Sequence, residues 1–174
     1  MVAIFEDREA WAAHYRANFE AHFHQTGEAD FKQYQRVRNR EPVTRPAIDV
    51  RASRVALITS SGAYLRAEQP PFDAENDLGD YTLRLFPAAT PLDALAFAHT
   101  HYDHAAVDAD AQVLVPLRHL EALAAEGAIG SFAPTAISFM GYQPDAARVV
   151  DETIPALVAA VRDQGADAAL LVPS

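Results

Sequence analysis

The chain of 174 residues contains no cysteine. Disulfides, thiolate metal sites and thiol chemistry are therefore excluded within these residues. Basic residues are also few, because 14 Lys and Arg stand against 24 Asp and Glu, for a formal net charge of −10. A nucleic-acid-binding protein normally carries a basic patch, so nucleic acid is not an expected partner.

Long hydrophobic runs are missing as well. No apolar stretch approaches the roughly 20 residues that span a bilayer, so we expect no membrane association. Residues 1 to 7, MVAIFED, lack the basic region and long apolar core of a signal peptide. These absences favour a cytoplasmic protein. Because 50% of its residues are hydrophobic, the chain can bury a sizeable core.

Residues 1 to 46 are predicted to form an N-terminal helical segment, with helix over residues 7 to 40. An aromatic residue recurs there at every fourth position, as is typical of one helix face. The aromatic residues are Trp11, Tyr15, Phe19 and Phe23. Rows of this kind usually pack in a core, although a partner-binding surface is an alternative. Pro42 and Pro46 then predict a linker.

Residues 47 to 174 alternate between predicted strands and helices. Strands are expected at residues 54 to 59, 81 to 86, 135 to 140 and 168 to 172, and helices after Pro116 and Val150. The run RVALIT at 54 to 59 is typical of a strand buried on both faces of a parallel sheet. Pro155 must kink its helix or restart it. This order predicts a three-layer α/β domain with a mostly parallel sheet and flanking helices.

Polar stretches follow the expected strands. They are Ser60-Ser61-Gly62, Phe86-Pro87, the histidine-rich stretch from His99, Met140-Gly141 and Pro173-Ser174. Ligands bind at the carboxyl ends of parallel strands, so we expect the site along these stretches. A sheet that finishes on a strand without a covering helix would leave apolar surface bare. We therefore expect the α/β domain to be incomplete at its C-terminal end.

The stretch AFAHTHYDHAA at residues 96 to 106 spells H-x-H-x-D-H. It resembles the signature of the metallo-β-lactamase superfamily, and this reading predicts a metal-dependent hydrolase. His99, His101 and His104 would hold one divalent metal, as a catalytic zinc needs about three protein ligands. A second metal lacks ligands, since the one later histidine, His119, falls on a predicted helix. Alternatively, the three imidazoles simply hydrogen-bond to the loop.

A wider resemblance covers residues 54 to 174 and competes with both interpretations. It rests on an ordered set of segments, which are RVALITSSGAYLR at 54 to 66, LGDYTLRL at 78 to 85, HTHYD at 99 to 103, VPLRHLEALAAEGAIG at 115 to 130, ISFMG at 137 to 141 and DETIPALVAAVRDQGADAALL at 151 to 171. Together they resemble the selenoprotein B family of glycine, sarcosine, betaine and D-proline reductases, in particular the short form found as the selenocysteine subunit of D-proline reductase.

The resemblance implies an oxidoreductase subunit that reductively cleaves a C–N bond of a small amino-acid-like substrate. It implies a thiol reductant or a partner reductase subunit, with oligomers possible, and no cofactor within this chain. The reactive selenocysteine or cysteine is expected just after Ser174, behind a UGA codon read as a stop. The 174-residue chain alone would then be inactive.

The resemblance also suggests roles for individual residues. His99, Tyr102 and Asp103 match the family's H-G-G-Y-D, whereas Thr100 and His101 stand where the family has glycines, and His104 is extra. By these matches His99 is expected to be an acid or base, Asp103 its orienting partner, and Tyr102 a donor to a substrate carboxylate. Substrate contacts are also expected from the turn and strand-end residues. These are Ser60, Ser61, Gly62, Met140 and Gly141.

Overall fold

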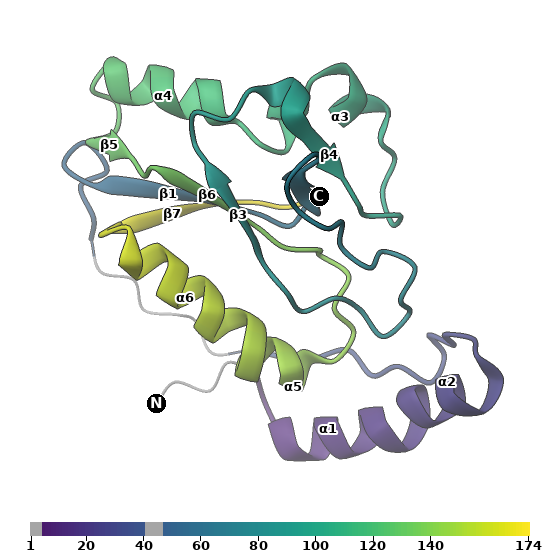
Figure 1. Ribbon diagram of the computed structural model, residues 1–174. Helices are drawn as coiled ribbons and strands as arrows, with labels where there is room; N and C mark the ends of the chain where they lie inside the picture. Colours follow the sequence, from purple (N-terminus) through teal and green to yellow (C-terminus); the bar gives the residue numbers. More distant parts are fainter. Residues whose placement is uncertain (1–4, 41–46) are drawn as a thin grey trace.

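The computed structural model describes residues 5–40 and 47–174, which form a mixed α/β fold with an N-terminal helix (Figure 1). One mostly parallel sheet contains β1 Arg54–Thr59, β3 Arg84–Pro87, β5 Ser131–Phe132, β6 Thr135–Ser138 and β7 Ala168–Val172. A separate antiparallel pair contains β2 Ala63–Leu65 and β4 Leu95–Phe97. The predicted α/β class is confirmed.

β1 lies at the centre of the sheet. β7 runs parallel to it along one side, from Val55 opposite Ala168 to Thr59 opposite Val172. On the other side β5 pairs with the start of β1 and β6 with its end, both in parallel. Every residue of β1 after Arg54 is buried. The continuous apolar run of the sequence thus reflects a strand covered on both faces.

Helices lie on both sides of the sheet (Figure 1). α4 Leu117–Ala125 lies on one side and α6 Ile154–Asp163 on the other. The sequence predicts Leu117, Leu120 and Leu123 on one apolar face of this helix. Leu117 and Leu120 do belong to the same buried cluster as Val55 and Leu57 of β1, whereas Leu123 is exposed. The remaining short elements are α3 Ala105–Ala109, α5 Ala146–Arg148 and the 3-10 turns η2 Leu92–Ala94 and η3 Ala111–Val113.

The helix around Pro155 is interrupted, as its sequence predicts. A π-helical turn, η4 Val149–Thr153, follows α5, and α6 starts at Ile154 with Pro155 in its first turn. Proline has no N–H to donate to the preceding turn and fits the first turn of a helix best. The wider π turn accommodates the change before α6 begins.

The predicted helix over residues 7 to 40 is wrong in its second half. Helix is found in α1 Arg8–Tyr15, the π-helical turn η1 Arg16–Glu20 and α2 Ala21–Thr26. Gly27 ends it in the left-handed conformation, at φ 74°, with its N–H donating to Phe23 O. The chain then turns back without further helix, because Phe31 and Tyr34 pack against Phe19.

Three of the four residues of the aromatic row are core, as its spacing predicts, and the fourth, Phe23, is half-buried. Trp11, Tyr15 and Phe19 are buried and stack in sequence, with ring centroids 5.2 Å and 5.5 Å apart. Partly buried Ala146, Ala147 and Val150 pack against this cluster, so the N-terminal segment contacts the α5–η4 region. An ion pair between Arg8 and Asp151 joins the same elements. The predicted linker prolines, Pro42 and Pro46, lie outside the described residues, as do residues 1–4.

β3 corrects one expectation about the edge of the sheet. It is antiparallel to β6, with Leu85 opposite Ile137 and Pro87 opposite Thr135. Phe86-Pro87 therefore lies at the opposite edge from the carboxyl ends of β1, β6 and β7, and does not join the stretches that were expected to share one site.

β7 is an edge strand of the sheet, and some of its apolar side chains are exposed to solvent. Among the described strands it pairs only with β1. Leu170 is 39% exposed and Leu171 67% exposed, which agrees with the expected bare apolar surface at this strand. Across residues 5–40 and 47–174, no helix has the length and apolar character needed to cross a bilayer.

Candidate active site

A pocket of about 640 Å³ opens at the carboxyl ends of β1, β6 and β7. One part of its wall is apolar, with Ile58, Phe139, Leu171, Val172 and Pro173. The other part contains Ser60, His99, His101, Gly141, Tyr142 and Ser174. The pocket thus lies where ligands bind in open parallel sheets, and the histidine loop contributes to it, as the sequence predicts.

The turn after β1 fixes the histidine loop. Gly62 has φ 69°, and a Cβ atom there would lie 2.6 Å from Ala98 O. The two residues are also joined by a hydrogen bond in which Ala98 N donates to Gly62 O at 3.0 Å. Only glycine allows this approach, so Gly62 sets the position of the backbone that leads directly into His99.

The same turn was expected to offer backbone N–H groups to a substrate carboxylate, but all three are engaged within the protein. Ser60 N donates to Val172 O at 3.1 Å and Gly62 N to Phe139 O at 3.0 Å. Ser61 N donates to Thr59 Oγ1 at 3.3 Å. Ser61 is fully buried, and its Oγ accepts from Thr59 Oγ1. Of the two serines, Ser60 alone lines the pocket, where its Oγ accepts from Ser174 N at 2.9 Å.

His99 is only 6% exposed and is held by its own loop. The backbone N–H of His101 donates to Nδ1 of His99 at 3.1 Å. Because Nδ1 accepts, the proton of the neutral ring must be on Nε2. Burial lowers the pKa of His99, and the neighbouring His101 and His104 lower it further. At neutral pH His99 is therefore an uncharged ring that presents an Nε2–H donor.

Tyr102 and His104 pack together behind His99. Nε2 of His104 donates to His99 O at 2.6 Å, and the ring of Tyr102 stacks on His104 with centroids 4.5 Å apart. The Tyr102 hydroxyl donates to Ser61 O at 3.2 Å. Burial raises the pKa of Tyr102 to about 12, so the hydroxyl keeps its proton. The hydroxyl expected to bind substrate thus ties the loop to the β1–β2 turn, and the extra histidine, His104, supports that loop.

Asp103 has a different partner from the one expected. Its Oδ1 accepts from Ala105 N at 3.0 Å, at the start of α3, and the residue is exposed. The group bonded to Nδ1 of His99 is instead the His101 N–H. The orienting function that the resemblance suggested for a carboxylate is provided by the backbone of the loop.

The arrangement does not support the metal-hydrolase alternative. In the described part of the chain, no three His, Asp or Glu side chains converge as metal ligands. The ring of His101 stacks on Tyr142, His104 is bonded to the backbone, and Nδ1 of His99 accepts from the loop. The motif spacing imitates a metal site, but the loop turns the three imidazoles toward different neighbours.

Met140 and Gly141, the two residues after β6 that were expected to contact substrate, lie in different environments. Met140 is fully buried and forms a bridge with Ser61, so it belongs to the core. Gly141 lines the pocket, and its N–H donates to Ser60 O at 2.9 Å. A Cβ at Gly141 would lie 3.2 Å from Ser60, so the residue allows the ends of β1 and β6 to meet closely.

Sequence reasoning missed Tyr142. Its ring lies against His101 with centroids 4.1 Å apart, and its hydroxyl donates to Asp77 O at 2.9 Å. The position directly after Gly141, at a strand end, was a usable signal for a pocket residue. Nothing in the sequence links residue 142 to residue 101, because only the fold brings the two loops together.

Comparisons with known proteins show which family the chain resembles. A family model described as glycine/sarcosine/betaine reductase selenoprotein B matches residues 20–173. D-proline reductase subunit gamma of Acetoanaerobium sticklandii is 32% identical over 130 residues, which cover 75% of this chain and 51% of that protein. The chain thus spans about half the length of the curated relative it matches. No solved structure matches it.

Proposed function

Because the chain belongs to the glycine/sarcosine/betaine reductase selenoprotein B family, we propose that it is a subunit of a thiol-linked reductase that cleaves a C–N bond of a small amino-acid-like substrate. The observation that carries this proposal is the pocket at the strand ends with a neutral His99 in its wall. The pocket volume, about 640 Å³, suits a small molecule.

The proposed reaction consumes two selenol or thiol groups. A selenolate or thiolate attacks the carbon that carries the amine, so that a Se–C or S–C bond forms while the C–N bond breaks and the amine leaves with a proton. A second thiol then attacks the selenium or sulfur, a Se–S or S–S bond forms, and the carbon takes up a proton. The substrate is reduced by two electrons, and the two selenol or thiol groups are oxidised together.

The nucleophile must come from outside the 174 residues, because they contain no cysteine. We propose a selenocysteine or cysteine that reaches the pocket beside Pro173 and Ser174, which line it. It belongs either to polypeptide joined to Ser174 or to a partner reductase subunit. A selenol is favoured because nucleophilicity needs the anion, and an ordinary thiol with a pKa near 8.5 is mostly protonated at neutral pH. No other cofactor is proposed for this chain.

His99 provides the donor on the protein side. Because Nδ1 is held by the loop, we propose that the Nε2–H of His99 points to the substrate and donates a hydrogen bond to it instead of removing a proton. A reductant made of thiols requires a compartment that keeps thiols reduced, and we accordingly propose a cytoplasmic location.

The test uses the protein purified from its native host, together with the subunits that co-purify with it. This preparation includes any residues that the host translates after the Ser174 codon. D-proline, glycine, sarcosine and betaine are each supplied with dithiothreitol, and the released amine or ring-opened product is measured. We expect one of these substrates to be reduced, and alkylation with iodoacetate to abolish the activity.

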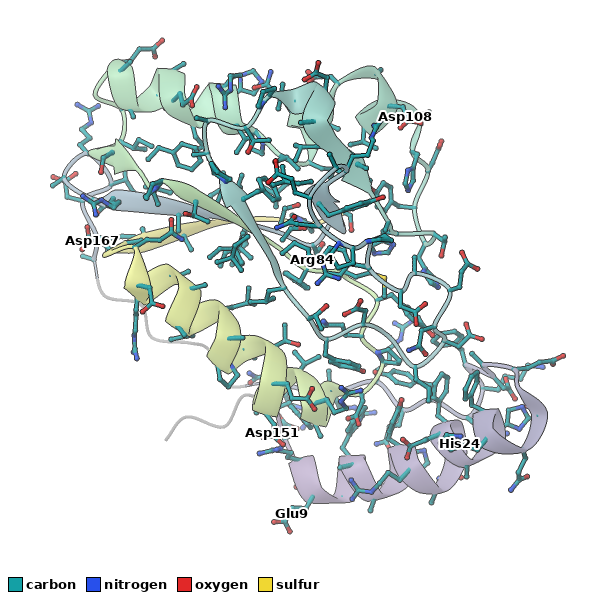
Figure 2. All side chains as sticks on the ribbon, in the orientation of Figure 1. Glu9, His24, Arg84, Asp108, Asp151 and Asp167 are labelled. Atoms are coloured by element: carbon teal, nitrogen blue, oxygen red, sulfur yellow. The ribbon has the colours of Figure 1, made fainter. Side chains whose placement is uncertain are left out.

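Two variants sharpen this test. His99→Phe, which removes the donor and keeps a ring, should lower kcat by roughly 10²-fold or more, the range for losing a positioned hydrogen-bond donor. His24→Gln is the matched control, because His24 is exposed on α2, away from the sheet (Figure 2), and should leave the rate unchanged. Failure to reduce any of the four compounds, in a preparation whose selenol or thiol is verified by mass spectrometry, would contradict the proposed function.

A further inference from the structure

The hydrogen-bond donors around the pocket are almost all in use. The N–H groups of Ser60, Ser61 and Gly62 bond to other parts of the protein, as does that of Gly141. The hydroxyl of Tyr142 donates to Asp77 O. Ser60 Oγ bonds to Ser174. The Ser60-Ser61-Gly62 turn therefore cannot donate N–H groups to a ligand unless existing hydrogen bonds break.

Two side-chain donors remain among the described lining residues, and both are imidazoles. Nε2 of His99 has no hydrogen-bond partner in the described chain and is not among its fully buried polar atoms that lack a partner, so it is accessible at the pocket. Nε2 of His101 likewise has no partner among the described residues, and its Nδ1 has only a long contact of 3.4 Å with Thr100 Oγ1. Both rings line the pocket.

The two rings are placed for one ligand group. Their centroids are 5.6 Å apart and their planes are inclined at 74°. A hydrogen bond from each ring nitrogen spans about 2.8 Å, so one carboxylate can accept from both rings through its two oxygens. His101 is itself held in place by its stacking on Tyr142, at 4.1 Å, which reduces the entropy lost on binding.

The described lining of the pocket carries no charged side chain that would repel an anion. Its described lining residues include no Asp or Glu, which would repel a carboxylate, and no Lys or Arg, which would pair with it. A carboxylate in a partly apolar pocket needs hydrogen bonds to compensate for lost hydration. A bond from a neutral imidazole N–H to a carboxylate is charge-assisted, because the acceptor is ionised, and His99 and His101 are the described lining side chains with an uncommitted N–H.

We propose that His99 and His101 together bind the substrate carboxylate, one N–H on each oxygen, and that His101 determines specificity for it. This inference rests on the proposed function, since it names how the same pocket recognises its amino-acid-like substrate. By the sequence resemblance, His101 stands where the family has glycine, so the second imidazole is a property of this chain. His101 therefore gives this chain a side-chain donor to the carboxylate that a glycine at the same position would not provide.

The test is a binding measurement on the 174-residue chain without reductant, so that no chemistry is required. D-proline, glycine, sarcosine and betaine are titrated by calorimetry, each against its carboxamide analogue, and imidazole nitrogen shifts are followed by NMR. We expect at least one carboxylate to bind while its amide does not, and the shifts to move at His99 and His101. The carboxylate is then the group recognised.

Variants of His101 decide between a ligand-binding and a structural role. His101 is exposed, so its replacement is not expected to unfold the chain. His101→Gly and His101→Phe should weaken carboxylate binding about tenfold or more, as expected for a lost charge-assisted bond, whereas His101→Arg should retain it. Phenylalanine keeps a ring to stack on Tyr142 and removes only the donor. His24→Gln serves again as the control and should bind like the wild type.

The outcomes separate the two proposals. Unchanged affinity in His101→Phe, equal binding of acid and amide, or no binding of any carboxylate would each overturn this inference. Reductase activity of the complete protein is scored independently. If activity is present and does not depend on His101, the proposed function stands and the carboxylate assignment falls. If carboxylates bind through His101 but none is reduced, the assignment stands and the proposed chemistry falls.

Discussion

The ring of Tyr142 lies flat against the ring of His101, with centroids 4.1 Å apart and planes inclined by only 5°. Phe31 makes an edge contact with Tyr142, with ring centroids 6.3 Å apart. The N-terminal segment, the loop after β6 and the histidine loop are thus joined ring to ring at the pocket. A change in any one of these segments is expected to move His101.

Acid should destabilise the fold through His99. An unfolded histidine titrates near about 6.5, whereas burial lowers the pKa of His99 in the fold. Between these two pKa values the unfolded chain binds a proton that the native chain does not, so stability falls as the pH drops below about 6.5 and levels off below the folded pKa. We expect the midpoint of urea unfolding, measured from pH 7.5 to pH 5, to show this fall.

The His99→Gln variant provides the comparison for that experiment. Glutamine does not titrate, so the variant should have a shallower dependence of unfolding free energy on pH across the same window. All other histidines are unchanged, and the difference between the two slopes isolates His99. Parallel slopes would show that burial of this imidazole has no effect on folding.

Gly62 should be far less tolerant of alanine than Gly27. Both have positive φ, at 69° and 74°, but a Cβ at Gly62 meets Ala98 O at 2.6 Å while nothing lies within 4 Å at Gly27. We expect Gly62→Ala to cost at least about 2 kcal/mol and Gly27→Ala about 1 kcal/mol. Denaturant unfolding of both variants measures the difference, and equal costs would show that the close approach to the histidine loop is not present.

Ser138 should tolerate alanine better than Ser61. Both residues are fully buried, but Ser138 Oγ has no partner among the described residues, whereas Ser61 Oγ accepts from Thr59 Oγ1 at 2.9 Å. Removing an unpartnered buried hydroxyl should leave stability within about 1 kcal/mol of the wild type or raise it, while Ser61→Ala should cost about 1–2 kcal/mol. Thermal unfolding of the two variants tests the order, and a larger loss at Ser138 would contradict it.

Zinc should not bind stoichiometrically at the histidine loop. His99, His101 and His104 engage different neighbours, and the described residues include no converging set of three metal ligands. We expect equilibrium dialysis against zinc to give the same low occupancy for wild type and His101→Ala. One tightly bound ion per chain that is lost in His101→Ala would restore the hydrolase interpretation.

The longer strands of the sheet and part of one helix face were predictable because each depends on local pattern, whereas the short strands β2, β4 and β5 were not predicted. The run at residues 54 to 59 is uninterruptedly apolar, and β1 is buried along nearly its whole length. The spacing of Leu117 and Leu120 placed both on one helix face, and both are buried. By contrast, the helix over residues 7 to 40 was predicted too long, because the return of Phe31 and Tyr34 onto Phe19 is a tertiary contact that overrides local periodicity.

The sequence by itself determined the α/β class, the stretch that carries the site and the family, since apolar periodicity, turn residues and ordered motifs are written in the chain. Only the tertiary structure decided what the histidines do. Their spacing is equally compatible with a metal site, and the choice depends on the folded loop and its distant contacts. The Tyr102 hydroxyl ties the loop to Ser61, and the ring of His101 stacks on Tyr142, each about 40 positions away along the chain. Hydrogen bonds and stacking between segments so distant in sequence leave no periodic signal, because they are fixed by how the strands pair.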